Sequence, residues 1–354
     1  MGSIPERTGR GQRNELTALA PSLISKIKQE RGMAVSAKTI LVTGGHGFIG
    51  TNMIHYYLNK YPDYQIVNID YNTEAANPER HHCPEQANRY SFHRVDIRNA
   101  YAISHLFELY DITDILHFAG ETRSLDRVGE IRLYEQTNVL GTLNLLHAAQ
   151  SAWMIDAHQP KPEYATSRFH HLSLADNLND TLYSESKERA DAMIQKFRDQ
   201  HGLDIVTTAS PEIFGPMQQE DELIPVAIRQ ALDGNLAIPE RGQQRNWLFV
   251  SDLCEAIDTV FHLGDAGQRY EIKIHTSLDD QKLSQQINAL VSEYFPGNST
   301  QMDQADHAHF SEASSIARKE VLGFAPFTPF KTGLEITLDW YIQKYKYADS
   351  IRKQ

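Results

Sequence analysis

A tyrosine and a lysine four positions apart are the residues of this sequence best suited to moving a proton. Tyr183 and Lys187 open a stretch in which apolar residues recur at helical spacing. On a helix these two side chains lie on one face, one turn apart. A nearby ammonium stabilises a phenolate, so we expect Lys187 to lower the pKa of Tyr183, which can then take the proton of a substrate hydroxyl. A surface tyrosine beside a solvated lysine is the alternative.

A glycine-rich turn is suited to holding the hydride acceptor that such chemistry needs. Residues 43–50 read TGGHGFIG, after an apolar run and before a helical pattern. Gly44 permits a tight turn, Gly47 lets the backbone approach a pyrophosphate, and Gly50 lets the helix pack closely on the strand. The free N–H groups at the start of the helix favour phosphates. These features together predict a dinucleotide site rather than a purely structural turn.

Two carboxylates at the ends of the following strands indicate which dinucleotide is bound. Asp70 comes 20 positions after Gly50, at the end of the next predicted strand. An acid at this place accepts hydrogen bonds from a ribose 2′-hydroxyl and repels a 2′-phosphate, which favours NAD over NADP. Asp96 follows the third predicted strand, where it can face the adenine amino group. Ordinary turn carboxylates are the alternative for both residues.

Short β-branched runs alternate with helical patterns from Lys38 onward, and this alternation is expected to position these residues. The predicted strands are 39–43, 65–69, 90–95, 114–118, 169–173 and 204–209, and helical spacing is found at 138–150 and 185–199. The pattern predicts an α/β fold, a doubly wound parallel (Rossmann) sheet with a smaller C-terminal α/β substrate lobe. Ligands of such sheets bind beyond the carboxyl ends of the strands, where the strand order reverses.

Breaks in this regularity suggest the domain boundaries. Proline-containing turns after about residue 211 indicate irregular excursions. We predict an NAD-binding domain at 38–210 with a return segment at about 245–275, a substrate lobe at 211–244 and 276–345, and a tail at 346–354. Residues 1–37 form a predicted N-terminal extension with one short surface helix or, alternatively, a helix that docks on another subunit. The extension lacks the apolar stretch of a secretory signal.

Composition excludes several classes of protein. The 34 Lys+Arg and 46 Asp+Glu give a net charge of −12, which argues against non-specific nucleic-acid binding. No uninterrupted apolar run of about 18 residues is present, so we expect no membrane span. Cys83 and Cys254 are too few for a disulfide framework or a thiolate cage, and the paired histidines lack spaced partners for a metal. We expect a cytoplasmic, acidic protein without metal.

Taken in order, motifs along residues 38–345 resemble the extended short-chain dehydrogenase/reductase family, closest to its dTDP-glucose 4,6-dehydratases. The segments that carry the resemblance are TGGHGFIG (43–50), VDI (95–97), HFAGET (117–122), TNVLGT (137–142), RFHHLS (168–173), LIP (223–225), RNWLFV (245–250) and LGF (322–324), with Tyr183 and Lys187. The resemblance implies NAD as the cofactor, a nucleotide-activated sugar as the substrate, and a homodimer built through the helices after Thr137 and Tyr183.

The resemblance also assigns further site residues. Ser173 joins Tyr183 and Lys187 in the catalytic set, and Glu121, Thr122 and Arg245 are expected to contact the substrate. The expected cofactor contacts are Gly44, Gly47, Phe48, Ile49, Gly50, Asp70, Asp96, Ile97, Phe118, Ala119, Gly120 and Thr137, together with Tyr183 and Lys187.

The sequence departs from the dehydratase pattern at the strand before the Tyr–Lys helix. There the dehydratases carry Ser-Thr-Asp-Glu, in which the resemblance assigns the Thr to activation of the 4-hydroxyl, the Glu to removal of the C5 proton and the Asp to protonation of the departing 6-hydroxyl. This chain has Ser173, Leu174, Ala175 and Asp176. Leu174 and Ala175 cannot transfer protons. Asp176 is either a base one methylene shorter than Glu or a helix or turn cap.

The substrate lobe departs as well. Glu212-Ile-Phe-Gly-Pro216 stands where the dehydratases have Asn-Asn-Tyr-Gly-Pro, so amides that help bind the sugar diphosphate are lost. The late arginine of the dehydratases is missing near 306–310. Arg245 remains, and an arginine fork suits phosphate oxygens.

Three hypotheses follow. The leading one is an NAD-dependent enzyme that oxidises a hydroxyl, at C4, of a nucleotide-activated sugar, with dehydration or epimerisation afterwards. The alternative is a catalytically impaired NAD-binding homologue that acts as a partner or regulator, which the loss of proton carriers at 174–175 motivates. A reductase on a non-nucleotide substrate is the third, and Asp70 argues against its use of NADPH.

Overall fold

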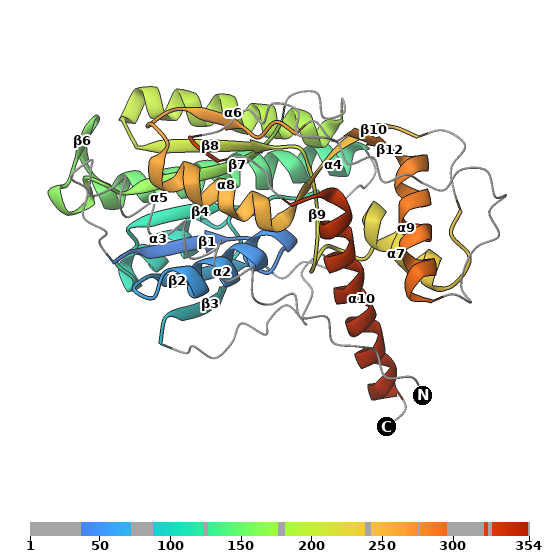
Figure 1. The fold of residues 1–354 in the computed structure, drawn as a ribbon. Helices are drawn as coiled ribbons and strands as arrows, with labels where there is room; N and C mark the ends of the chain where they lie inside the picture. The colour runs from blue at the N-terminus through green and yellow to red at the C-terminus, as the bar shows by residue number, and fades with distance from the viewer. Residues whose placement is uncertain are drawn as a thin grey trace.

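The computed structural model describes residues 37–71, 88–122, 127–175, 181–237, 242–274, 277–295, 322–324 and 328–352 of the 354-residue chain. Within these residues the central sheet has seven parallel strands in the order β11-β8-β7-β4-β1-β2-β3 (Figure 1). The strands are β1 (Thr39–Thr43), β2 (Gln65–Asp70), β3 (Tyr90–Arg94), β4 (Asp114–His117), β7 (Arg168–Leu174), β8 (Ile205–Ser210) and β11 (Arg269–Glu271). All six predicted strands form, with ends within one residue, and the doubly wound α/β fold is confirmed.

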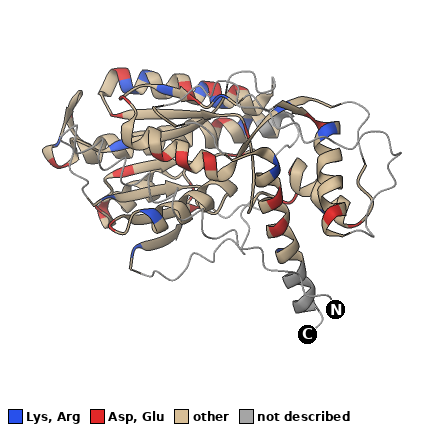
Figure 2. Ribbon diagram, in the orientation of Figure 1, with Lys and Arg blue, Asp and Glu red and all other residues tan. Residues whose placement is uncertain are grey.

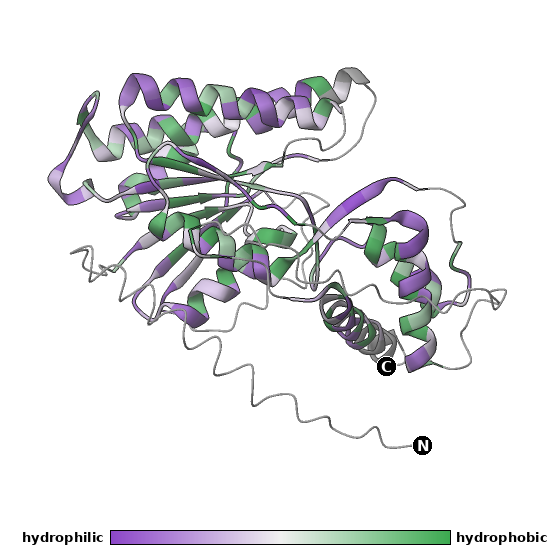
Figure 3. Ribbon diagram, turned by 45° about the horizontal axis from the view of Figure 1, so that its top comes forward, coloured by the Kyte–Doolittle hydropathy of each residue, from purple (hydrophilic) through white to green (hydrophobic). Residues whose placement is uncertain are grey.

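Helices cover both faces of this sheet. On one face α2 (Phe48–Lys60) packs beside α8 (Val250–Leu263), and on the other lie α3 (Ala100–Leu109), α5 (Thr142–Trp153) and α6 (Leu182–His201). In β1, Ile40 and Val42 belong to the first core and Leu41 to the second, because successive side chains of a strand point to opposite faces. The central strands accordingly contain many hydrophobic residues (Figure 3), which contribute to the cores on both faces of the sheet.

Charged side chains lie mostly on the outer helices, while the strands between them carry few (Figure 2). None of the described helices combines the length and the apolar character needed to cross a bilayer.

The helix predicted at 138–150 begins earlier than expected and changes its winding. α4 (Arg127–Tyr134) continues through a π-helical segment, η2 (Glu135–Gly141), into α5. The Thr142 hydroxyl donates a hydrogen bond of 2.7 Å to the Asn138 carbonyl within this segment. π-helical turns are rare and frequently occur at functional sites.

The C-terminal part contributes a smaller sheet. Its described strands follow the order β12-β10-β9, with β10 parallel to β9 and antiparallel to β12. The strands are β9 (Glu212–Phe214), β10 (Gln244–Phe249) and β12 (Ser277–Asp279), and α7 (Leu223–Leu232), α9 (Asp280–Tyr294) and α10 (Phe330–Arg352) share a core with them. The expected return segment thus divides: β10 joins this smaller sheet, whereas α8 and β11 join the central layers. The proposed domain boundaries stay predictions, and residues 1–36 lie outside the described part.

Two short elements lie between α5 and β7. A hairpin of β5 (Met154–Asp156) and β6 (Gln159–Pro160) is followed by the 3₁₀ turn η3 (Pro162–Tyr164).

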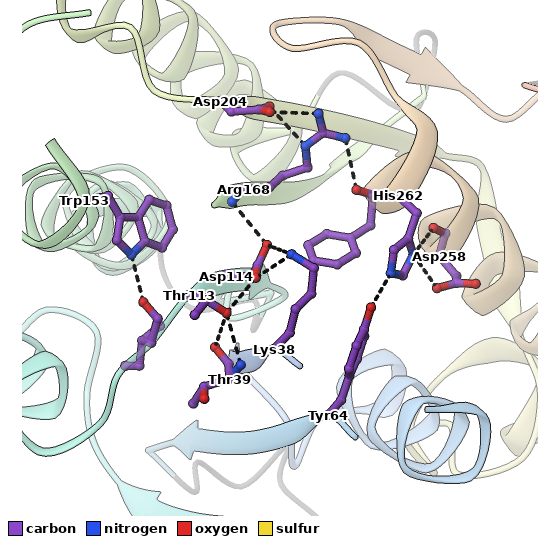
Figure 4. Close-up of polar contacts among 12 residues, drawn as sticks. Lys38, Thr39, Tyr64, Thr113, Asp114, Trp153, Arg168, Asp204, Asp258 and His262 are labelled. Atoms are coloured by element: carbon purple, nitrogen blue, oxygen red, sulfur yellow. Dashed lines mark hydrogen bonds and ion pairs between the residues drawn. The ribbon is translucent and has the colours of Figure 1, made fainter. Parts of the chain in front are cut away.

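Polar networks hold the edge of the central sheet where its strands begin (Figure 4). The Lys38 ammonium lies 2.7 Å from both oxygens of Asp114, a fully buried carboxylate at the start of β4. Arg168, at the start of β7, donates its backbone N–H to Asp114 and forms a 2.8 Å ion pair with Asp204. These contacts pair charged side chains at the end of the sheet where the strands begin. The opposite end, where the strands finish, remains for the site.

Candidate active site

A cleft of about 660 Å³ opens at the carboxyl ends of the central strands. It lies where the strand order reverses, between β1 and β4, as expected for ligand sites of this fold. All but one of the site residues selected from the sequence line it. They are Gly44, Gly47, Phe48, Ile49, Gly50, Asp70, Asp96, Ile97, Phe118, Ala119, Gly120, Glu121, Thr122, Thr137, Ser173, Tyr183, Lys187 and Arg245. The exception, Asp176, lies outside the described residues.

The glycine turn forms the floor of the cleft at the start of α2. Gly44 has a φ of +71°, and a Cβ there would lie 2.7 Å from the Ala119 nitrogen. A Cβ on Gly50 would lie 2.2 Å from the Gly44 carbonyl oxygen. Both positions therefore require glycine, and the turn leaves the N-terminus of α2 open toward the cleft. A backbone cradle ahead of a helix N-terminus fits a dinucleotide pyrophosphate.

The two carboxylates selected for the nucleoside end have different partners. Asp70 accepts a 3.0 Å hydrogen bond from the His46 backbone N–H, which ties the end of β2 to the glycine turn. Asp96 is paired with Arg98 through both of its oxygens. Burial raises the pKa of Asp96, but the hydrogen bonds and the charge of Arg98 together outweigh this effect. The pKa of Asp96 therefore lies below its usual value. Asp96 is therefore an anion that Arg98 partly neutralises.

A capping box places Tyr183 in the first turn of α6. The Thr181 hydroxyl accepts a hydrogen bond from the Ser184 backbone N–H, and the Ser184 hydroxyl accepts one from the Thr181 backbone N–H. The Tyr183 ring lies edge-on to Tyr134, with 6.0 Å between the ring centres. The expected lowering of its pKa is wrong for this structure: burial, followed by the charges of Glu222 and Tyr134, raises the pKa of Tyr183 to about 12.

Lys187 points from the same helix toward β7. Its ammonium donates a 2.8 Å hydrogen bond to the Leu172 carbonyl. Burial lowers the pKa of Lys187 to about 8, against the charge of Asp191, which raises it. The lysine is thus a half-buried cation held at the end of β7, and not a fully solvated surface residue.

The wall of the cleft formed by the end of β7 lacks proton carriers. The Ser173 hydroxyl donates a 2.6 Å hydrogen bond to Asp191. Leu174 lines the cleft with an aliphatic side chain, and Ala175 donates its backbone N–H to the Ser210 carbonyl. The structure thus agrees with the sequence that positions 174 and 175 offer no acid or base.

Arg245 is engaged by carboxylates. Its guanidinium lies 2.6 Å from a Glu212 oxygen and 2.9 Å from an Asp280 oxygen, and it also donates to Gln243. The expectation that this fork is available for phosphate oxygens does not match this arrangement, because two carboxylates already balance the charge.

Sequence reasoning missed Glu222, a carboxylate of the cleft. It stands directly before α7, where its side chain makes no capping hydrogen bond, and it lines the cleft. Burial and the neighbouring Asp221 and Glu212 raise its pKa. Its position directly before the Leu-Ile-Pro segment was the available signal.

Asn138 is a second residue that sequence reasoning did not single out, although it lies in the TNVLGT segment. Its side-chain oxygen accepts a 2.7 Å hydrogen bond from the Glu121 N–H. Its amide donates to the Glu121 carbonyl at 3.1 Å and to the Ser186 hydroxyl at 2.9 Å. Asn138 thereby fixes the loop after β4 against α6, with Glu121 on one side of the cleft and Tyr183 on the other.

Comparison with known proteins assigns the chain to a family. The model of the NAD dependent epimerase/dehydratase family matches residues 40–273. The chain belongs to this family. It is 31% identical to a dTDP-glucose 4,6-dehydratase of Haemophilus influenzae, over 86% of this chain and 97% of that protein. It is 30% identical to the dTDP-glucose 4,6-dehydratase of Neisseria meningitidis, over 89% of this chain and 96% of that protein.

A solved structure extends the likeness to the fold and the cofactor. The dTDP-glucose 4,6-dehydratase of Bacillus anthracis, crystallised in complex with NAD, superposes with a TM-score of 0.69 at 26% identity, over 88% of this chain and 98% of that one. The resemblance to the dehydratase branch of the family is thus confirmed, and the family uses NAD.

Replacing Asp70 by alanine is expected to weaken NAD binding by about 10- to 100-fold, since a hydrogen bond to a charged group contributes about 1.5–3 kcal/mol. The variant is also expected to gain affinity for NADP, because the repulsion of the 2′-phosphate is removed. Isothermal titration calorimetry with both dinucleotides measures this. Asp63→Ala, in the exposed turn before β2, is the control. An unchanged NAD affinity in Asp70→Ala would show that the carboxylate does not contact the ribose.

Proposed function

We propose that this chain oxidises a hydroxyl of a nucleotide-activated sugar, at C4, and then completes a dehydration or an epimerisation. The observation that carries the proposal is the single cleft shared by the glycine turn, Tyr183 and Lys187. Its curated relatives are dTDP-glucose 4,6-dehydratases, which supports a sugar nucleotide as the substrate. We also propose a homodimer in the cytoplasm.

The residues of this chain divide the work of the first step. In the proposal the glycine turn holds the pyrophosphate of NAD and Asp70 holds the ribose hydroxyls. NAD bound by these residues would supply the hydride acceptor for this oxidation. Tyr183 accepts the proton of the substrate hydroxyl. Because burial and Glu222 raise its pKa to about 12, Tyr183 needs nearby positive charge to act as a base, and Lys187 provides part of it.

The later step needs a proton carrier that Leu174 and Ala175 do not provide. We propose Glu222 for this role, with Asp176 as the other candidate. Glu222 lines the cleft, and its raised pKa lets it hold a proton closer to neutral pH than an exposed glutamate does. In a dehydration it takes the C5 proton as the C6–O bond breaks, and it returns that proton to the departing hydroxyl as water forms.

A catalytically impaired partner or regulator is the second candidate. Two observations favour it: the aliphatic end of β7, and the engagement of Arg245 by Glu212 and Asp280. Binding and turnover distinguish the two candidates.

Mass spectrometry of products after incubation with NAD and dTDP-, UDP-, GDP- or CDP-glucose tests the proposal. Loss of 18 mass units is expected for dehydration, and an unchanged mass with a new epimer for epimerisation. In Glu222→Gln we expect the absorbance rise near 340 nm to persist while product formation falls by about 100-fold or more. Glu220→Gln, whose carboxylate pairs with Lys344, is the control. Tight NAD binding with no sugar-nucleotide binding and no product would support the partner role and overturn the proposal.

A further inference from the structure

Lys187 is a half-buried cation whose charge needs support. Its Nζ donates to the Leu172 carbonyl, and no other hydrogen bond of this ammonium is found within the described residues. A carbonyl oxygen carries only a partial charge, and burial strongly favours the neutral amine. Burial accordingly lowers the pKa of Lys187 to about 8, only slightly above neutral pH. A lysine that is to stabilise a phenolate must nevertheless stay protonated.

Asp191 lies one turn further along α6, on the same face as Lys187. The Ser173 hydroxyl donates a 2.6 Å hydrogen bond to one of its oxygens, and Arg269 Nε lies 3.8 Å from the same oxygen. His171 Nε2 lies 3.2 Å from the other oxygen. Burial raises the pKa of Asp191, but the contacts with His171, Ser173 and Lys187 outweigh it and lower the pKa overall. Asp191 is therefore an anion at neutral pH.

The other titratable groups around Lys187 cannot take this role. His171 on β7 and His117 on β4 are both fully buried. Burial lowers the pKa of His171 to about 4 and that of His117 well below its usual value, so both are neutral. Tyr183 on α6 is protonated, because its pKa is raised to about 12. Among the described residues that act on Lys187, Asp191 is thus the one that carries negative charge.

We propose that Asp191 is a positioning residue of the proton-transfer site, whose carboxylate keeps Lys187 protonated and holds the Ser173 hydroxyl at the end of β7. The effect of Asp191 on catalysis rests on the proposed function, because Asp191 acts on Tyr183 through Lys187. The Ser173 hydroxyl donates its hydrogen bond to Asp191 in this arrangement. The hydrogen bond from the Lys187 ammonium to the Leu172 carbonyl joins α6 to the end of β7 at the same place.

The test measures the protonation of Lys187 directly. NMR of protein labelled with ¹³Cε-lysine follows each lysine through a pH titration, and the signal missing from Lys187→Arg assigns the resonance. In Asp191→Asn we expect the Lys187 midpoint to fall by about one pH unit or more, because the opposite charge one helical turn away, which raises its pKa, is removed. Asp191→Glu, which keeps the charge, is expected to restore most of the shift. Asp199→Asn, two turns further on and at an exposed position, is the control.

The NMR titration does not require turnover, so its result is independent of whether the proposed function is correct. Equal midpoints in wild type and Asp191→Asn would overturn the inference even if the enzyme were active. A lowered midpoint would support it even if no sugar nucleotide reacted. Where Asp191→Asn does not fold, Asp191→Ser removes the same charge with a smaller side chain and is expected to show the same fall. With an active substrate, the alkaline limb of the pH–rate profile moves to lower pH in the same variants, since the neutral amine forms earlier.

Discussion

Tyr183→Phe is expected to lower turnover by about 10²- to 10⁴-fold while NAD affinity changes little, the range typical for loss of a general acid–base group. The substitution removes one hydroxyl and keeps the ring that packs edge-on against Tyr134. The proton of the substrate hydroxyl then has no phenol to accept it. Initial rates at 340 nm and calorimetry with NAD measure the two quantities separately.

The matched control for this variant is Tyr134→Phe. Tyr134 is buried beside Tyr183 and contributes to the raised pKa of its phenol. Tyr134→Phe removes the Tyr134 hydroxyl but keeps the Tyr183 phenol, so turnover is expected to stay within a few-fold of wild type. If Tyr183→Phe retained wild-type turnover, the role of this phenol as the proton acceptor would be excluded, whatever the fate of the cofactor site.

Asp258→Ala is expected to destabilise the chain by about 3–5 kcal/mol, the cost of breaking a buried charge pair on one side. The Asp258 carboxylate is fully buried between α2 and α8. It lies 2.7 Å from the Lys60 ammonium, accepts hydrogen bonds from the Tyr61 hydroxyl, and lies 2.9 Å from His262 Nδ1. Figure 4 shows the part of this network that continues through His262 to Tyr64.

The stabilisation by Asp258 is also expected to depend on pH. Burial raises the pKa of Asp258, but His262 and Lys60 more than offset this and bring the pKa well below its usual value. A carboxylate with a lowered pKa stabilises the fold above its unfolded pKa of about 3.9, and this stabilisation is lost as the pH falls through the lower folded value. Urea unfolding at pH 7 and at stepwise lower pH should therefore show the wild-type advantage over Asp258→Ala shrinking in acid.

Asp265→Ala, an exposed carboxylate just after α8, is the control for this series. It is expected to change the free energy of unfolding by less than about 0.5 kcal/mol. A similarly small change for Asp258→Ala would mean that the network contributes little and that the buried charges are compensated in another way.

The departures from the dehydratase pattern fall among the residues expected to process the substrate. Residues of the glycine turn, Asp70, Tyr183 and Lys187 all line the cleft. Changes occur where a substrate is processed, at Leu174, Ala175 and Glu212. A chain that keeps the residues for oxidation and changes those for the later proton transfers is consistent with a changed fate of the keto intermediate. Product analysis therefore distinguishes the candidate reactions better than the rate of any single variant.

The sequence by itself determined the local parts of this protein. The spacing of Gly44, Gly47 and Gly50 set the turn: a Cβ on Gly47 or Gly50 would crowd the Gly44 carbonyl oxygen, a local demand, whereas the tight approach of Ala119 to Gly44 is made by the fold. Alternation of β-branched runs and helical spacing was sufficient to predict six of the seven described central strands to within one residue, since burial on both faces of a parallel sheet leaves a continuous apolar run. The seventh, β11, was not predicted as a strand. The pair Tyr183 and Lys187 shares a helix, so its geometry too is local.

Tertiary structure alone decided the charges and partners of the same residues. Ser173 meets Asp191 across the packing of β7 on α6, and Arg245 meets Glu212 and Asp280, 33 and 35 positions away. The pKa of Tyr183 is raised rather than lowered because burial and then Glu222, from the segment before α7, disfavour the phenolate, while the Lys187 ammonium donates to the Leu172 carbonyl. Spacing along a chain fixes which face a side chain occupies, but desolvation and distant charges, which the fold assembles, fix its protonation.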